Sequence, residues 1–306
     1  MQASHDIFVN GEHLDDNEFG GRITRTLAAK GFCIVNGVVS QETRHGLLLE
    51  IEGIQNSDRF YFSHDVLQTG MLGETGSTRI ARLHDQELLH PALDSLIGNV
   101  DAIGWLLKTC GATFEFELRG RTPTLLHDFS QNTFSLPRGT PFTDSDVLEW
   151  LDWHTWSRIL IIFFVGPSLG SLMLTLNDED ALPYTVAIEP GTCVILRSDK
   201  LNYSFEPSSP DMEARCYAVC AWFLENMQKH SWLRTRGMPV PGASQKCYQG
   251  LDEWLFARLQ NASVDRDRER HGSPDFRKHL PGSLELAMKS LLRSEFAKHT
   301  QIAITG

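Results

Sequence analysis

Positive charge, paired cysteines and long apolar runs are all scarce in this sequence. Its 28 lysines and arginines are outnumbered by 39 aspartates and glutamates, which gives a formal net charge of −11. Nucleic acid and anionic membranes repel such an acidic chain, so neither is expected as a partner. The six cysteines include no Cys-x-x-Cys pair, and we interpret them as core thiols of a protein from a reducing compartment.

Several familiar signals are absent as well. The first residues, MQASHDIFVNG, have neither a basic patch nor an apolar core, so no signal peptide is predicted. Apolar runs such as residues 159–165 are too short to cross a bilayer. The sequence contains no phosphate-binding GxxxxGK(S/T) loop, GxGxxG turn or HExxH helix. A location in the cytoplasm or another reducing intracellular compartment is therefore predicted, without a membrane span.

The residue patterns divide the chain into three regions. Residues 1–112 are predicted to form an N-terminal helical region whose first strand packs on the core. Residues 113–225 are predicted to form that core, and residues 226–306 a C-terminal extension with two amphipathic helices. Because no internal repeat or low-complexity segment separates the regions, one integrated domain is expected.

Helix boundaries in the first region follow from capping residues. One helix is predicted to end at Gly31, because glycine is common just beyond helix C-termini. A strand over residues 32–39 is predicted next, interrupted by a turn at Asn36 and Gly37. Ser40 is a favourable N-cap for a second helix, and a third is predicted over residues 91–108, which open with proline.

The middle region changes to short apolar segments divided by turn residues. Many short strands with close turns favour a sandwich or jelly roll over a parallel sheet. The predicted fold class is therefore α+β, with a double-stranded β-helix (jelly-roll) core flanked by N-terminal and C-terminal helices. The predicted strands cover residues 114–118, 124–129, 159–165, 172–176, 184–188, 192–196, 202–205 and 216–224.

Two features of this region make the prediction specific. Along one strand, Leu160, Ile162 and Phe164 should face one side, and Ile161 and Phe163 the other. One set is expected inside a barrel of two sheets, and the other beneath helices of the first region. Between the strands, residues 145–157 carry apolar residues at helical spacing and are predicted to form a helix.

Four stretches of the sequence follow the pattern of a known family. They are RILIIFFVGPSLGSLML, IEPGTCVILRSDKLNYSF and ARCYAVCAWFL in the middle region, and KGFCIVNGVVS near the N-terminus. Together they resemble the jelly roll of the 2-oxoglutarate/Fe(II) oxygenases, in particular its prolyl-hydroxylase-like branch. The resemblance covers residues 31–39 and 158–224 and implies the same fold.

The iron-binding signature of that family is incomplete here. The resemblance implies an iron ion held by two histidines and one carboxylate on one face of the site. The first two ligands come as His-x-Asp or His-x-Glu, because strand residues two apart point the same way. Only His13-Leu14-Asp15 has this spacing, and it precedes every predicted barrel strand. The metal motif is therefore interpreted as degenerate.

Two further positions carry the family's cofactor contacts. Tyr203, in DKLNYSFEP, stands where the resemblance places the second histidine, and a neutral phenol is a poor Fe(II) ligand. Arg215 is the best match to the arginine that binds the 2-oxoglutarate carboxylate. The resemblance thus marks Tyr203 and Arg215 as candidate cofactor-binding residues. The alternative for Arg215 is an ion pair with Glu213 or a loop carboxylate.

Substitute metal ligands can be named among the remaining histidines and aspartates. His127 and Asp128 are adjacent, so on one strand they would point to opposite faces and would not hold one ion together. Asp152 and His154 have the two-residue spacing of a strand, but the surrounding periodicity is helical and would turn them apart. His127, His154 and Asp152 remain candidates, and no complete metal site is predicted.

Three functions are compatible with these patterns. The first is a non-catalytic, oxygenase-like jelly-roll protein that lacks the complete iron triad, carries no cofactor and binds a protein or small-molecule partner. The second is a divergent oxidoreductase that depends on Fe(II) and 2-oxoglutarate and uses His127 with a carboxylate from residues 140–157. The third is an enzyme of another class, such as an isomerase or lyase, because a fold does not fix function. The absent metal signature favours the first.

Overall fold

The computed structural model describes residues 5–9, 16–57, 59–62, 71–73, 78–83, 90–110, 113–114, 116–129, 150, 153–154, 156–176, 182–208 and 215–225. Contacts divide the chain into two units, one of residues 1–141 and 156–226 and the other of residues 142–155 and 227–306. All strands and helices named below belong to the first unit. The predicted C-terminal helices lie outside the described residues, and the single integrated domain stays a prediction. No helix in the described ranges is long and apolar enough to cross a membrane.

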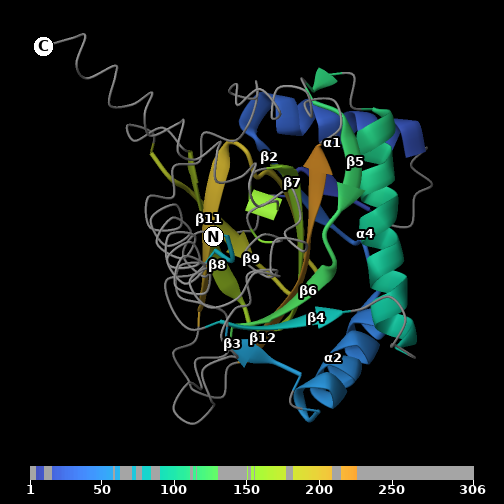
Figure 1. Ribbon diagram of the computed structural model, residues 1–306, viewed down its shortest axis with the longest axis vertical. Helices are drawn as coiled ribbons and strands as arrows, with labels where there is room; N and C mark the ends of the chain where they lie inside the picture. Colours follow the sequence, from blue (N-terminus) through green and yellow to red (C-terminus); the bar gives the residue numbers. More distant parts are fainter. Residues whose placement is uncertain are drawn as a thin grey trace, which may run out of the picture. The chain divides into compact units, whose positions relative to one another are not determined.

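The first unit is built on one large sheet. Its described strands are β1 (Ile7–Phe8), β2 (Phe32–Asn36), β3 (Tyr61–Phe62), β4 (Arg79–Leu83), β5 (Leu118–Arg121), β6 (Thr124–Asp128), β7 (Ser157–Pro167), β10 (Cys193–Arg197) and β12 (Cys216–Glu225). They run in the order β1-β2-β10-β7-β12-β6-β4-β3, and β5 also pairs with β12 (Figure 1). Among the described pairs, β1 with β2 is parallel and the others are antiparallel.

A smaller antiparallel sheet packs against the large one. It consists of β11 (Leu201–Pro207), β8 (Gly170–Leu176) and β9 (Tyr184–Ile188), in the order β11-β8-β9. Phe205 of β11 joins the two sheets, because its ring centroid lies 4.7 Å from that of Phe129 and 4.8 Å from that of Phe164. We call the face of the large sheet that meets the smaller sheet the inner face. The predicted α+β jelly-roll fold is confirmed.

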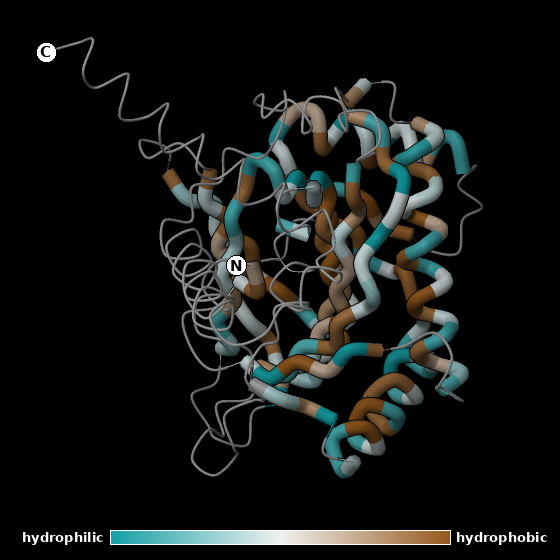
Figure 2. Tube along the Cα trace, viewed as in Figure 1, coloured by the Kyte–Doolittle hydropathy of each residue, from teal (hydrophilic) through white to brown (hydrophobic). Residues whose placement is uncertain are grey.

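Three helices within the described residues cover the opposite face of the large sheet, which we call the helix face. They are α1 (Asp16–Lys30), α2 (Gln41–Gln55) and α4 (Pro91–Thr109) (Figure 1). Apolar residues follow the middle strands of the sheet and recur along α4 (Figure 2). The sheet residues buried with these helices are Cys33, Val35, Ala81, Leu83, Leu126, Ile159, Ile161, Phe163, Val165, Cys193, Ile195, Tyr217, Val219, Ala221 and Phe223.

The alternation predicted for β7 is confirmed. Ile161 and Phe163 belong to the core beneath the helices. Leu160, Ile162 and Phe164 are equally buried but lie outside that core, and Phe164 contacts the smaller sheet. Both faces of the strand are therefore covered, which is the reason that its sequence is apolar throughout rather than alternating with polar residues.

The capping and turn residues predicted in the first region are found in the structure, and a glycine sets the packing of α4. The side chain of Ser40 accepts a hydrogen bond from the backbone N–H of Thr43 and caps α2. Strand β2 ends before Gly37, whose φ of +82° favours glycine. Gly104 of α4 lets the helix approach the sheet, because a Cβ there would lie 1.9 Å from the Phe223 ring.

One predicted strand is wrong. Residues 114–118 were expected to form a strand, but β5 begins only at Leu118. Phe114 and Phe116 precede it and stack in parallel, with ring centroids 5.2 Å apart. The guanidinium of Arg197 lies 4.7 Å from the Phe116 ring centroid. The alternating phenylalanines thus reflect two rings that cover an arginine, and not strand pairing.

Candidate functional site

His127 of β6 is fully buried on the inner face. Its strand neighbours Leu126 and Asp128 point toward the helices, and it pairs with Ile80 of β4 and Ala218 of β12. Neither ring nitrogen has a hydrogen-bond partner within the part of the chain that the structure describes. Burial lowers the pKa of His127 to about 3, so the imidazole is neutral near pH 7.

Asp128 lies on the other side of the sheet. It is fully buried and forms an ion pair with Arg79 of β4. Its strand partner on β12 is Tyr217, which belongs to the core beneath the helices. The prediction that His127 and Asp128 point to opposite faces is confirmed. Asp128 is therefore unable to bind the same metal ion as His127.

Tyr203 faces the interior between the two sheets. It lies on the same face of β11 as Leu201 and Phe205, and both of these residues are buried. Its ring packs directly on the backbone of Gly73, where an added Cβ would lie 1.9 Å from the ring. The backbone N–H of Phe205 donates to the carbonyl of Gly73 over 3.0 Å. The position that the resemblance assigns to the second histidine thus holds a tightly packed phenol.

Arg215 precedes β12 and points away from the interior. Its side chain is 49% exposed, and its Nη1 atom lies 3.5 Å from Oε1 of Glu52 in α2. Tyr217, two residues further along, also faces α2 and donates a hydrogen bond of 2.9 Å to Gln55. The residue of this segment that faces inward is Cys216, which is fully buried. Arg215 therefore forms an ion pair with a carboxylate, as the alternative interpretation expected. The partner, however, is Glu52 on a helix and not Glu213 or a loop carboxylate.

The remaining metal candidates belong to the second unit. His154 is helical and buried, as are Trp150 and Trp153, whose ring centroids lie 4.7 Å apart with an edge-on arrangement. Asp152 lies outside the described residues, as does most of the helix predicted over residues 145–157. Within the described ranges, no group of three His, Cys, Asp or Glu side chains is placed to hold a metal ion.

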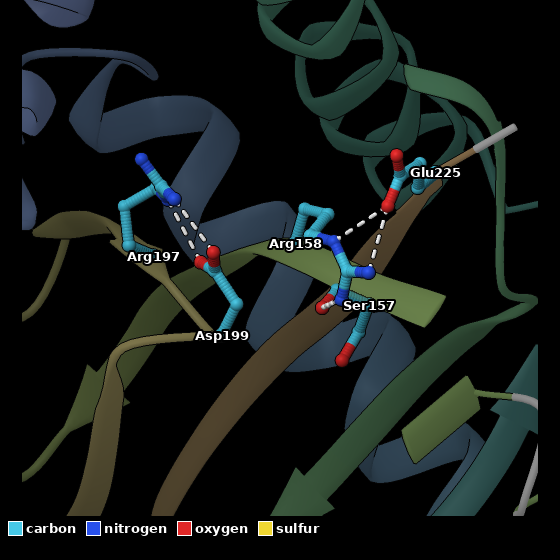
Figure 3. Close-up of polar contacts among 5 residues, drawn as sticks. All are labelled: Ser157, Arg158, Arg197, Asp199 and Glu225. Carbon is cyan, nitrogen blue, oxygen red and sulfur yellow. Dashed lines mark hydrogen bonds and ion pairs between the residues drawn. The ribbon is translucent and has the colours of Figure 1, made fainter. Parts of the chain in front are cut away.

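Two ion pairs near the ends of the sheet strands, one buried and one partly buried, were not identified from the sequence. Nε of Arg158 donates to Oε2 of Glu225 over 2.9 Å, and Nη2 lies 2.7 Å from the same oxygen (Figure 3). Arg197 binds Asp199 through two contacts of 2.7 and 2.6 Å (Figure 3). Arg197 and Asp199 are two residues apart, so their pairing could have been predicted from the sequence. Arg158 and Glu225 are distant in sequence, and only the pairing of β7 with β12 brings them together.

The buried imidazole predicts a loss of stability in acid. Because the pKa of His127 falls from about 6.5 in the unfolded chain to about 3 in the folded protein, the unfolded state binds the extra proton below pH 6.5. Stability is complete above pH 6.5 and is lost as the pH falls toward 3, by roughly 2–3 kcal/mol at pH 4.5. Urea unfolding across this range should show that the free energy of unfolding of the wild type falls as the pH falls. In His127→Leu the slope of this free energy against pH should correspond to one proton fewer. An unchanged slope would contradict the assignment.

Known proteins resemble this chain in structure and not in sequence. No protein-family model matches the sequence. No curated protein matches it either. A prolyl hydroxylase from Trichoplax adhaerens, solved with a peptide of the hypoxia-inducible factor oxygen degradation domain, superposes with a TM-score of 0.52 and 16% identity over 71% of this chain and 93% of that one.

Two further prolyl hydroxylases superpose on this chain with TM-scores below 0.5. A prolyl-4-hydroxylase from Pseudomonas putida gives a TM-score of 0.47 at 12% identity, covering 68% of this chain and all of that one. A prolyl 4-hydroxylase from Phytophthora capsici gives 0.45 at 14% identity, covering 92% and 94%. The superposition on the Trichoplax enzyme shows that this chain has the 2-oxoglutarate/Fe(II) oxygenase fold. At 16% identity it shows the fold alone.

Proposed function

We propose that this protein uses the oxygenase-type jelly roll for binding, and not for iron-dependent oxidation. Within the described residues, the fold lacks the complete iron triad of the 2-oxoglutarate/Fe(II) oxygenases. Its partner is a protein or a small molecule. The observation that carries this proposal is the packing of Tyr203, the residue that the resemblance aligns with the second histidine, against the backbone of Gly73. A neutral phenol replaces imidazole poorly as an Fe(II) ligand. The cytoplasmic location stays a prediction.

The described interior residues do not fit an Fe(II) ion. Two histidines and a carboxylate on one face are the usual ligands of a non-haem iron that leaves positions open for substrate and oxygen. Here His127 is the one described histidine on the inner face of the large sheet, and its neighbour Asp128 is paired with Arg79 on the helix face. Arg215, the candidate for an oxoacid contact, pairs with Glu52. These placements support a binding role.

A divergent oxidoreductase is the second candidate. The observation in its favour is that both nitrogens of His127 lack partners among the described residues, which leaves the imidazole able to bind a metal. This function requires carboxylate and further ligands from outside the described ranges. Its cofactors would be Fe(II) and 2-oxoglutarate.

Iron loading separates the two candidates. After anaerobic incubation with Fe(II) and desalting, elemental analysis of the wild type should find well under one equivalent of iron, because the described residues supply no complete ligand set. His127→Ala should give the same low value. His45→Ala, which removes an exposed histidine of α2, is the matched control. Near-stoichiometric iron that is lost in His127→Ala and kept in His45→Ala would contradict the binding proposal and favour the divergent oxidoreductase.

A further inference from the structure

Trp105 of α4 is a large aromatic side chain that the fold leaves in solvent. It is 62% exposed, although α4 buries its other side against the sheet. Tryptophan is highly buried on average and is enriched at the centres of protein interfaces. The ammonium of Lys108, one turn further on, lies 5.1 Å from the centroid of the same ring. The outer face of α4 is therefore a candidate contact surface.

Small residues leave the helix low on the same side as the tryptophan. Gly98 and Ala102 lie seven and three residues before Trp105, so the three residues follow one another along one face of α4. An added Cβ at Gly98 would meet nothing within 4 Å. A bulky side chain from a partner is therefore able to approach the helix backbone there. This face carries both a large side chain and a place that receives one.

The charged residues of this face balance one another. Helix α4 carries Asp94, Asp101 and Lys108, and Arg121 of β5 pairs with Asp101 over 2.5 Å. These two negative and two positive charges cancel, although the whole chain carries a net charge of −11. Two copies of so acidic a chain repel each other unless the faces that meet are locally neutral. The outer face of α4 meets this requirement.

The order of these residues along α4 is self-complementary. Asp94 and Lys108 are spaced equally about Asp101, and Gly98 and Trp105 are centred within one residue of the same point. A two-fold axis through this point makes α4 of a second copy antiparallel to the first. Trp105 of each copy then lies over Gly98 of the other, and Lys108 lies opposite Asp94. Asp101, which lies near the axis, already has a cationic partner in its own chain.

We propose that the protein forms a symmetric dimer in which the outer faces of α4 from two copies pack antiparallel. Trp105 fills the space above Gly98 of the second copy, and ion pairs between Asp94 and Lys108 fix the register. Because α4 has 19 residues and is therefore only about 28 Å long, the contact is small and the expected Kd is on the order of 10–100 µM. This dimer is independent of iron and of the proposed binding function.

Sedimentation velocity measures the dimer directly. Between about 1 µM and about 500 µM, the wild type should convert from monomer to dimer. Trp105→Ala should raise the Kd at least about tenfold, because it removes the largest side chain of the contact. Phe8→Ala is the matched control, since it removes another aromatic residue that is 53% exposed, and it should dimerise like the wild type. Melting curves check that every variant is folded.

Gly98→Leu separates a specific contact from general apolar association. Leucine is a good helix former and has open space at this position of the monomer, so the variant should fold. In the dimer, the leucine occupies the space that Trp105 of the second copy needs, and the Kd should rise at least about tenfold. Non-specific association would instead be strengthened by an added leucine.

Charge reversal tests the antiparallel register. Asp94→Lys places a lysine opposite Lys108 of the second copy and should weaken the dimer. Adding Lys108→Asp to this variant restores opposite charges and should recover the affinity. A wild type that stays monomeric at every concentration, a dimer unchanged in Trp105→Ala, or a dimer strengthened in Gly98→Leu would overturn the α4 dimer. A double charge variant that binds no better than Asp94→Lys would overturn the register.

Discussion

Glu225→Gln is expected to destabilise the protein by about 3–5 kcal/mol, because it removes a charged partner from a buried guanidinium. The side chains of Arg158 and Glu225 are 1% and 5% exposed, so neither charge is solvated. The two contacts at 2.9 and 2.7 Å to one carboxylate oxygen replace the lost hydration. Urea unfolding at pH 7 measures the change.

A double variant separates charge burial from packing. Arg158→Met combined with Glu225→Leu removes both charges and should recover much of the stability that the single change loses. Glu117→Gln is the matched control, because its partner Arg119 is 52% exposed and such a surface pair contributes less than about 1 kcal/mol. A loss below 1 kcal/mol in Glu225→Gln would show that the pair is solvated.

The second large effect concerns two glycines of one helix. Gly104→Ala is expected to cost about 3 kcal/mol, because the new Cβ would lie 1.9 Å from the Phe223 ring and force α4 or the ring to move. Gly98 of the same helix has nothing within 4 Å of an added Cβ. Gly98→Ala should therefore stabilise α4 by about 0.5–1 kcal/mol through its helix propensity.

Thermal unfolding of both glycine variants gives a direct comparison. Opposite signs are expected, although the substitution is the same in each. Adding Phe223→Leu to Gly104→Ala should reduce the loss that Gly104→Ala causes, because leucine is smaller and more easily displaced. Equal changes at the two positions would mean that α4 does not pack on the sheet through Gly104.

Strands β7, β10 and β12 were predictable from sequence because both of their faces are buried. Apolar segments such as residues 159–165 need no knowledge of their neighbours to be recognised, since turn residues delimit them. The alternation of Leu160 and Ile161 also follows from strand geometry alone. By contrast, the pair of rings at Phe114 and Phe116 has the same spacing as a strand. Only the position of Arg197 beneath them shows why no strand forms there.

The candidate site was less predictable than the fold, and the head of β12 shows the reason. Whether Arg215 or Cys216 faces inward depends on the pairing of Tyr217 with Asp128, which no local pattern fixes. A change of one residue exchanges the two faces of a strand. His127 could be named as a candidate, but its lack of partners depends on side chains from three strands.

The order of strands in the large sheet has a consequence for synthesis on the ribosome. Strand β2 lies beside β10, and β12 lies between β7 and β6, so segments made early pair with segments made late. At roughly 5–20 residues per second, the chain between β2 and β10 takes on the order of ten seconds or more to emerge. During that interval the apolar strands have no permanent neighbours, and sheets of such high contact order also close slowly. The nascent chain is therefore exposed to aggregation until its last central strand has left the ribosome.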